Sequence, residues 1–288
     1  MICDQCPRKC HAERDKKPGF CGFDDRAWVS HVSTHAWEEP CISGERGAGT
    51  VFFSGCNLRC VFCQNAAISR GTQGKAATVD DLCALFERVE QSGAECLDLV
   101  NPTHFTSVIR EALTRRKPSL PVVWNSGGYE CAETVRTLDG LVDVYMPDLK
   151  YVTPEVSQRY SGAADYFTYA SEAITEMFRQ TGRAVFDERG MMKRGTLVRH
   201  LVLPAHVGET VKVLTWLHEH LPDVTVSLMG QYFPAADAHL YPEIDRRLKR
   251  AEYKRALDAL ERLGFDSGFY QELGAADERF VPHFDGSY

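Results

Sequence analysis

The chain is organised around residues 50–65, which read TVFFSGCNLRCVFCQN. The stretch begins as a short apolar run rich in β-branched and aromatic residues, which predicts a buried strand. It then breaks at Gly55 into a loop that carries Cys56, Cys60 and Cys63 in a C-x3-C-x2-C spacing. Three thiolates so close together are typical of a soft metal or an iron–sulfur cluster. A structural zinc loop is the alternative, but zinc needs a fourth ligand, and none follows within ten residues.

This loop resembles the signature of the radical S-adenosylmethionine (SAM) superfamily, with Asn57 after the first cysteine and Phe62 before the third. The resemblance implies a 4Fe–4S cluster held by Cys56, Cys60 and Cys63, with SAM bound at the open iron. One electron from the reduced cluster would cleave SAM to a 5′-deoxyadenosyl radical, which takes a hydrogen atom from the substrate.

Composition sets the outer bounds. The chain has 288 residues, with 33 Lys+Arg against 40 Asp+Glu and a net charge of −7, so no general affinity for nucleic acid or an anionic membrane is expected. We find no apolar run long enough to span a bilayer and no signal peptide. The 11 cysteines are clustered, which favours metal binding in a reducing cytoplasm over disulfides.

Residues 1–48 are predicted to form a small cysteine-rich metal-binding module. Four cysteines lie in its first half: Cys3, Cys6, Cys10 and Cys21. They could close a zinc site or hold a second iron–sulfur cluster, and their spacing alone does not separate the two. A third alternative is a reduced segment without metal. Cys41 is a candidate extra or substitute ligand.

Residues 49–265 are predicted to alternate between strands and helices. Strands are expected at the start of the cysteine stretch and at residues 96–101, 121–125, 142–148, 197–203 and 224–229. Helices are expected at residues 79–92, 105–116, 130–139, 154–180, 209–220 and 242–263. This alternation predicts an α/β fold with parallel strands, either a partial (β/α)6 barrel, which the resemblance implies, or an open doubly wound sheet. Residues 182–195 are expected to form a hairpin or a lid, and residues 266–288 a tail covering the barrel edge.

Polar or glycine-rich clusters follow every predicted strand. Chemistry collects at the carboxyl ends of parallel strands, so these clusters predict a cofactor site. Lys150 or Arg199 would pair with the carboxylate of SAM, and Asp148 would hold a cation or orient Lys150. His104 and His200 could be proton donors or substrate contacts, and His200, which lies in an apolar strand, could instead be a buried core residue. The complete set of expected cofactor-binding residues is Asn101, Thr103, Asn125, Ser126, Asp148, Lys150, Arg199 and Gln231.

Within the superfamily the chain looks most like the pyruvate formate-lyase activating enzyme group, the glycyl-radical-enzyme activases, and closest to an uncharacterised branch related to them. Asp148-Leu149-Lys150 resembles the Asp-x-Lys strand end of the activases, which implies that Lys150 contacts SAM. The strand around Arg199 resembles their arginine strand. Two departures stand out: Asn101-Pro102-Thr103-His104 replaces a Gly-Gly-Glu-Pro stretch, and Asn125-Ser126-Gly127 lacks an acidic residue.

Three functions remain open from sequence. The first is a radical SAM oxidoreductase that abstracts hydrogen from a protein or peptide, as activases do. The second is a radical SAM enzyme acting on a small molecule. The third is a non-enzymatic iron–sulfur or zinc module for electron transfer or scaffolding. Either enzyme would need a one-electron reductant such as flavodoxin or ferredoxin.

Overall fold

The computed structural model describes residues 2–71, 73–265, 267–271, 273 and 284. Its centre is a sheet in which six strands run parallel and follow one another in chain order, confirming the predicted α/β class. These strands are β2 (Ala48–Phe53), β4 (Leu97–Val100), β5 (Val122–Ser126), β6 (Val144–Pro147), β8 (Met192–Leu201) and β9 (Thr225–Met229).

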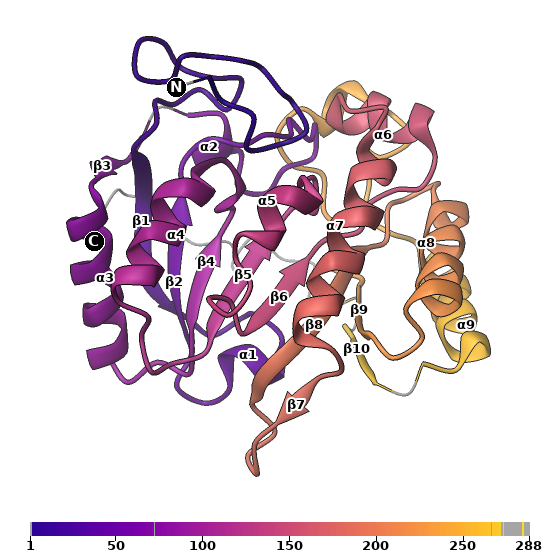
Figure 1. Cartoon of the computed structure of the whole chain (residues 1–288). Helices are drawn as coiled ribbons and strands as arrows, with labels where there is room; N and C mark the ends of the chain where they lie inside the picture. Colours follow the sequence, from indigo (N-terminus) through magenta and orange to yellow (C-terminus); the bar gives the residue numbers. More distant parts are fainter. Residues whose placement is uncertain (1, 72, 266, 272, 274–283, 285–288) are drawn as a thin grey trace.

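Helices cover one face of this curved sheet (Figure 1). They are α3 (Val79–Gln91), α4 (Thr106–Arg115), α5 (Ala132–Arg136), α6 (Pro154–Ser161), α7 (Tyr166–Thr181), α8 (Val207–His220) and α9 (Arg250–Leu263). The helical stretches expected across 154–180 are α6 and α7, which are separate because Gly162 adopts a left-handed conformation and caps α6. The predicted start of the last helix at residue 242 is wrong, because α9 begins at Arg250. The Lys249 N–H, just before this start, donates to the Glu252 carboxylate.

The sheet does not close on itself. One end is β10 (Gly268–Tyr270), parallel to β9, and the other is β3 (Lys75–Ala77), which pairs with β1 (Ala27–His35). Strand β1 runs antiparallel to β2. An open path fits both alternatives, but the helices of the described residues cover only one face of a curved sheet (Figure 1), which confirms the partial barrel, because a doubly wound sheet carries helices on both faces. Residues 27–35, which the sequence placed in the cysteine-rich module, thus supply a strand to the sheet. Most of the predicted tail at 266–288 lies outside the described residues.

A short helix, α1 (Pro40–Ser43), lies at the end of the barrel where the parallel strands begin (Figure 1). Cys41 and Ile42 are buried there against apolar residues from the beginnings of those strands: Cys96, Val123, Val144 and Leu197. Cys41 is therefore a core residue at the opposite end of the molecule from residues 2–24, and the prediction that it could be a metal ligand of that module is wrong.

Residues 182–195 form a hairpin of β7 (Val185–Phe186) and the start of β8. The hairpin projects at the α1 end of the molecule, away from α2 (Ala66–Ser69) and the cysteine loop (Figure 1). It is tied down there by Glu95, which binds both Arg46 and Arg189. Of the two expectations, the hairpin is correct and the lid is wrong. No helix in the described ranges is long and apolar enough to cross a membrane.

Glu209 fixes the turn between β6 and α6. Its carboxylate, 6% exposed on α8, accepts the Val152 N–H at 2.9 Å and the Thr153 N–H at 2.8 Å, and binds Lys212 at 2.9 Å. Burial acts to raise the pKa of Glu209, but these hydrogen bonds outweigh it and lower that pKa to about 2. Lys150 lies between the end of β6 and this turn.

We predict that Glu209→Gln lowers the free energy of unfolding by about 1–3 kcal/mol, because hydrogen bonds to a charged group are lost. The carboxylate stabilises the fold fully above its unfolded pKa of 4.5, and this contribution disappears as pH falls toward about 2. Urea denaturation at about pH 7 and about pH 4 should show a smaller difference between wild type and variant at the lower pH. Glu219→Gln, at an exposed position of the same helix, is the control. Equal stabilities of all three proteins would contradict the role of Glu209.

Candidate active site

The cysteine loop leaves β2 at the carboxyl end of the sheet. The Leu58 N–H donates to the Cys56 sulfur at 3.3 Å, and the sulfurs of Cys60 and Cys63 contact the hydroxyls of Ser161 at 3.0 Å and Ser69 at 3.4 Å. Cys56 interacts electrostatically with both other cysteines. Burial raises the pKa of Cys56 and of Cys60, so iron would have to displace their protons on binding. Three adjacent thiols bonded to hydroxyl and amide donors fit the cysteine set of an iron–sulfur cluster.

Asn101 supports this loop from the neighbouring strand end. It holds a left-handed conformation with φ 60°, and its side-chain amide donates to the Gly55 carbonyl just before Cys56. On the other side the Asn57 amide donates to the Tyr129 carbonyl at 2.6 Å. The loop is therefore clamped at both ends of its first turn, and Asn101 lies beneath it as a positioning residue.

A cavity of about 240 Å³ runs from the cluster cysteines into the barrel. Five of the eight expected cofactor-binding residues line it: Asn125, Asp148, Lys150, Arg199 and Gln231. The structure does not bring Asn101, Thr103 and Ser126 to this cavity. Thr103 donates to Glu130 at 2.6 Å, and the Ser126 hydroxyl accepts the Gly128 N–H at 3.3 Å. Their expected contacts with SAM remain predictions.

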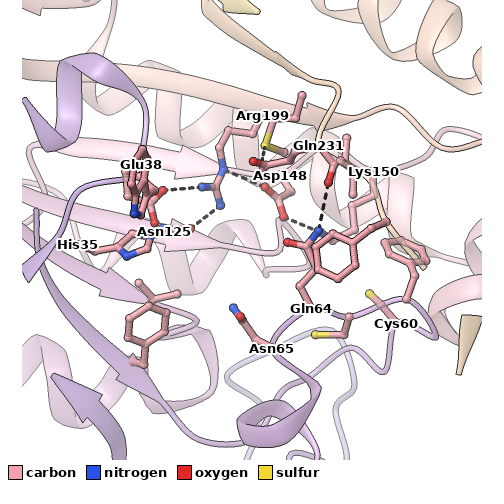
Figure 2. A pocket seen from close by; sticks show the side chains of 18 residues that line it. His35, Glu38, Cys60, Gln64, Asn65, Asn125, Asp148, Lys150, Arg199 and Gln231 are labelled. Atoms are coloured by element: carbon pink, nitrogen blue, oxygen red, sulfur yellow. Dashed lines mark hydrogen bonds and ion pairs between the residues drawn. The ribbon is translucent and has the colours of Figure 1, made fainter. Parts of the chain in front are cut away.

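A chain of ion pairs crosses the cavity, as Figure 2 shows. Arg199 binds Glu38 at 3.0 Å, Asp148 at 3.0 Å and the side-chain oxygen of Asn125 at 2.6 Å. The other oxygen of Asp148 accepts Lys150 at 2.5 Å. The two cations therefore share Asp148, with Arg199 toward Glu38 and Lys150 toward the cluster, where its charge acts on Cys60.

Burial affects the pKa values of the carboxyl groups inside the barrel. Burial alone would raise the pKa of Asp148, but Lys150 and Arg199 outweigh it and hold the pKa below its usual range. Burial raises the pKa of Glu38, Glu39 and, far more, Asp98. Arg199 has its guanidinium occupied by carboxylates from three directions, whereas Lys150 bonds to Asp148 alone among the described side chains. Lys150 is therefore the better placed of the two cations to bind an anionic ligand near the cluster.

Sequence reasoning missed one wall of the cavity. His35, Trp37 and Glu38, from the connection between β1 and α1, line its end away from the cluster. A weak signal was present in the adjacent acids Glu38 and Glu39 before Pro40, where proline begins a helix and fixes the direction of the chain.

The two candidate histidines lie outside the cavity. His104 Nε2 is 2.7 Å from the Ser54 carbonyl, and His200 lies 2.7 Å from the Leu149 carbonyl and 2.9 Å from the Thr210 hydroxyl. Burial lowers the pKa of His104 to about 3 and that of His200 to about 4. Both are neutral core residues near pH 7, which for His200 is the buried alternative weighed from sequence, whereas for His104 the expected role as a proton donor or substrate contact is wrong.

Comparisons with known proteins identify a 4Fe-4S domain in this chain and the family to which the chain belongs. The family model described as a 4Fe-4S single cluster domain matches residues 42–157, a range that contains the cysteine loop. The uncharacterized protein MJ0674 of Methanocaldococcus jannaschii is 30% identical over 275 residues, which cover 92% of this chain and 75% of that protein. The chain belongs to the family of MJ0674. The 4Fe-4S match supports an iron–sulfur cluster, and its assignment to Cys56, Cys60 and Cys63 stays a prediction.

Among solved structures, Streptococcus suis SuiB bound to the precursor peptide SuiA aligns with a TM-score of 0.48 and 13% identity over 75% of this chain. The chain spans 46% of the length of SuiB. A likeness at this level says nothing about the substrate of the MJ0674 family.

We predict that Arg199→Ala costs about 3–5 kcal/mol of stability, because it leaves several buried carboxyl groups without their cation. Lys150→Ala should cost clearly less, since Asp148 keeps its bond to Arg199. Guanidinium denaturation of both variants measures the difference. Arg115→Ala, which removes exposed ion pairs, should stay within about 1 kcal/mol of wild type. A larger loss for Lys150→Ala than for Arg199→Ala would contradict this division.

Proposed function

We propose that the chain is a radical SAM enzyme, an oxidoreductase that acts on a protein or peptide as the glycyl-radical-enzyme activases do. When bound, the cluster would supply the electron that cleaves SAM to a radical able to abstract hydrogen. The 4Fe-4S match, the three-cysteine loop and the partial parallel barrel support the superfamily-level part of the proposal. The single observation that carries it is Lys150, an ammonium group at the cluster end of a cavity that Cys60 and Cys63 also line.

The chain's own residues would have distinct tasks. Cys56, Cys60 and Cys63 would hold the cluster, and Asn101 and Asn57 would keep their loop in place. Lys150 would bind the carboxylate of SAM, with Asp148 fixing its direction from behind.

The choice of a protein or peptide substrate rests on the resemblance of Asp148-Leu149-Lys150 and of the strand around Arg199 to the corresponding strands of the activases.

The cluster chemistry is tested by anaerobic reconstitution, reduction with dithionite in the presence of SAM, and chromatography for 5′-deoxyadenosine. Wild type should produce it, and Cys60→Ala should not, because one cluster ligand is lost. Cys83→Ala is the matched control, because this thiol lies on α3 and donates to the Ala112 carbonyl, not to a residue of the cysteine loop. Product formation by Cys60→Ala would sink the proposal.

Lys150→Ala should weaken SAM binding about tenfold or more, the loss expected for a charge-assisted hydrogen bond worth roughly 1.5–3 kcal/mol. Lys150→Arg should recover part of the affinity because it keeps the charge. Calorimetric titration of the reconstituted proteins with SAM measures the effect. Unchanged affinity in Lys150→Ala would remove Lys150 from the SAM site.

The substrate class is tested with an extract of the source organism, divided by dialysis into retained and diffusible fractions. Each is added to the reconstituted enzyme, and the rate of 5′-deoxyadenosine formation is followed. Stimulation by the retained fraction that protease treatment abolishes would support a protein substrate. Stimulation by the diffusible fraction alone would favour the small-molecule alternative.

A further inference from the structure

The N-terminal segment lies directly over the cysteine loop (Figure 1). Arg8 Nε donates to the Asn57 carbonyl at 2.7 Å, and its guanidinium lies 4.2 Å from the centre of the Phe20 ring. Arg59 of the cysteine loop covers the same ring at 4.5 Å. The proposed SAM chemistry uses none of the four cysteines in this segment, so their purpose needs a separate explanation.

Two of the four thiols lie beside Gly19, and electrostatic interactions link the other two to them. A side-chain carbon placed on Gly19 would be 3.4 Å from the Cys10 sulfur and 3.6 Å from the Cys21 sulfur. The Cys6 thiol interacts electrostatically with those of Cys3 and Cys21, and the Cys21 thiol with those of Cys3 and Cys10. All four are free thiols. Thiols up to 18 positions apart in sequence therefore lie in one region of the N-terminal segment.

Backbone amides approach these sulfurs as they do in the cysteine loop of the barrel. The amides of Arg8 and Ala12 interact with the sulfurs of Cys6 and Cys10, in each case two residues after the cysteine. The Leu58 amide bonds the Cys56 sulfur with the same spacing. Amide donors around sulfur stabilise a thiolate, the form that binds metal.

The turns that create this arrangement are strained. Lys9 and His11 lie in the left-handed region with φ 40° and 49°, although neither is glycine. Such conformations are uncommon outside glycine and persist where the surrounding structure imposes them. Each strained residue lies next to Cys10, so the strain coincides with the thiol cluster.

A buried cation adjoins the thiols. Arg14 is 2% exposed, and its guanidinium donates to the carbonyls of Phe23, Asp24 and His104. Its Nη1 also lies 3.9 Å from the Cys3 sulfur. A guanidinium held this firmly favours negative charge on nearby sulfur, as a set of thiolates around a metal would provide.

Within the described chain, no three metal-binding side chains lie close enough to share one metal ion, and this holds equally for Cys56, Cys60 and Cys63. A tetrahedral zinc with Zn–S bonds of about 2.3 Å needs sulfurs roughly 3.8 Å apart. An iron–sulfur cluster takes one thiolate on each of several irons and so accepts a wider spacing. The N-terminal thiols share this absence, and the amide contacts to sulfur, with the barrel cysteines, and this likeness favours a cluster over zinc.

We propose that Cys3, Cys6, Cys10 and Cys21 bind a second iron–sulfur cluster through four thiolates. The four thiols release their protons on binding, and the buried Arg14 offsets part of the resulting charge. The full set of four protein ligands leaves no iron open for SAM, so this cluster has a different role from the one in the barrel. The proposal does not depend on SAM chemistry.

The test uses the full chain with Cys56→Ala, Cys60→Ala and Cys63→Ala combined, so that only the N-terminal thiols remain. After anaerobic reconstitution we expect about four irons and about four sulfides per chain, against about eight of each in wild type. Reduction should give the paramagnetic resonance signal of a reduced cluster. Zinc in place of iron, or a protein with neither, would overturn the proposal.

A second comparison guards against loss of folding. Cys6→Ala and Cys10→Ala in the otherwise wild-type chain should remove about half of the iron and leave the barrel cluster, with circular dichroism unchanged. Cys83→Ala should retain all of the iron. If the Cys6→Ala, Cys10→Ala protein is folded and keeps the full iron content, the N-terminal thiols hold no cluster. Either result is independent of whether 5′-deoxyadenosine is formed.

Discussion

The interior of this barrel depends on one buried cation. Arg199 extends from β8 into a lumen lined by carboxyl groups, where an unpaired charge of either sign is strongly unfavourable. Its partners come from separate parts of the chain: Glu38 before α1, Asn125 on β5 and Asp148 at the end of β6. The short helix that closes the barrel is therefore tied to the same charge that orders the cavity. The charge of Arg199 thus holds Glu38 just before α1 and neutralises the carboxylates of the barrel interior. Both contacts shape the end of the cavity away from the cluster.

This constraint also sets how freely Lys150 can act. Asp148 is shared between both cations, so Lys150 is held toward the cluster without being locked by several carboxylates. The backbone on either side is fixed as well, since the Tyr166 hydroxyl bonds the Lys150 amide at 3.0 Å and the Asp148 carbonyl at 2.7 Å. The side chain is thus positioned through its neighbours, while its remaining hydrogens can meet an anionic group. Arg199 therefore has a structural role, whereas Lys150 is available to bind an anionic ligand.

What the sequence could predict follows from how local each feature is. The six parallel strands and their polar ends were predictable because strand patterning and strand termination are local signals. Glu38 was not predictable as a site residue, because its partner Arg199 lies 161 positions away and only the folded sheet brings them together. Thr103 was expected in the right loop but points elsewhere, since a 3-10 turn at Thr103–Phe105 directs it to Glu130. The side of a loop to which a residue points is a tertiary property.

The two cysteine sets are also mechanically connected. Gly55, just before Cys56, has φ 80°, and a side-chain carbon there would come within 2.5 Å of the Cys21 carbonyl and 2.6 Å of Phe23. The cysteine loop thus needs glycine both for its backbone conformation and for the close approach of the N-terminal segment. From below, Asn101 holds the same carbonyl of Gly55. The loop is therefore confined between these two layers, and Gly55 is the point at which the N-terminal segment, the cysteine loop and the strand end of Asn101 meet.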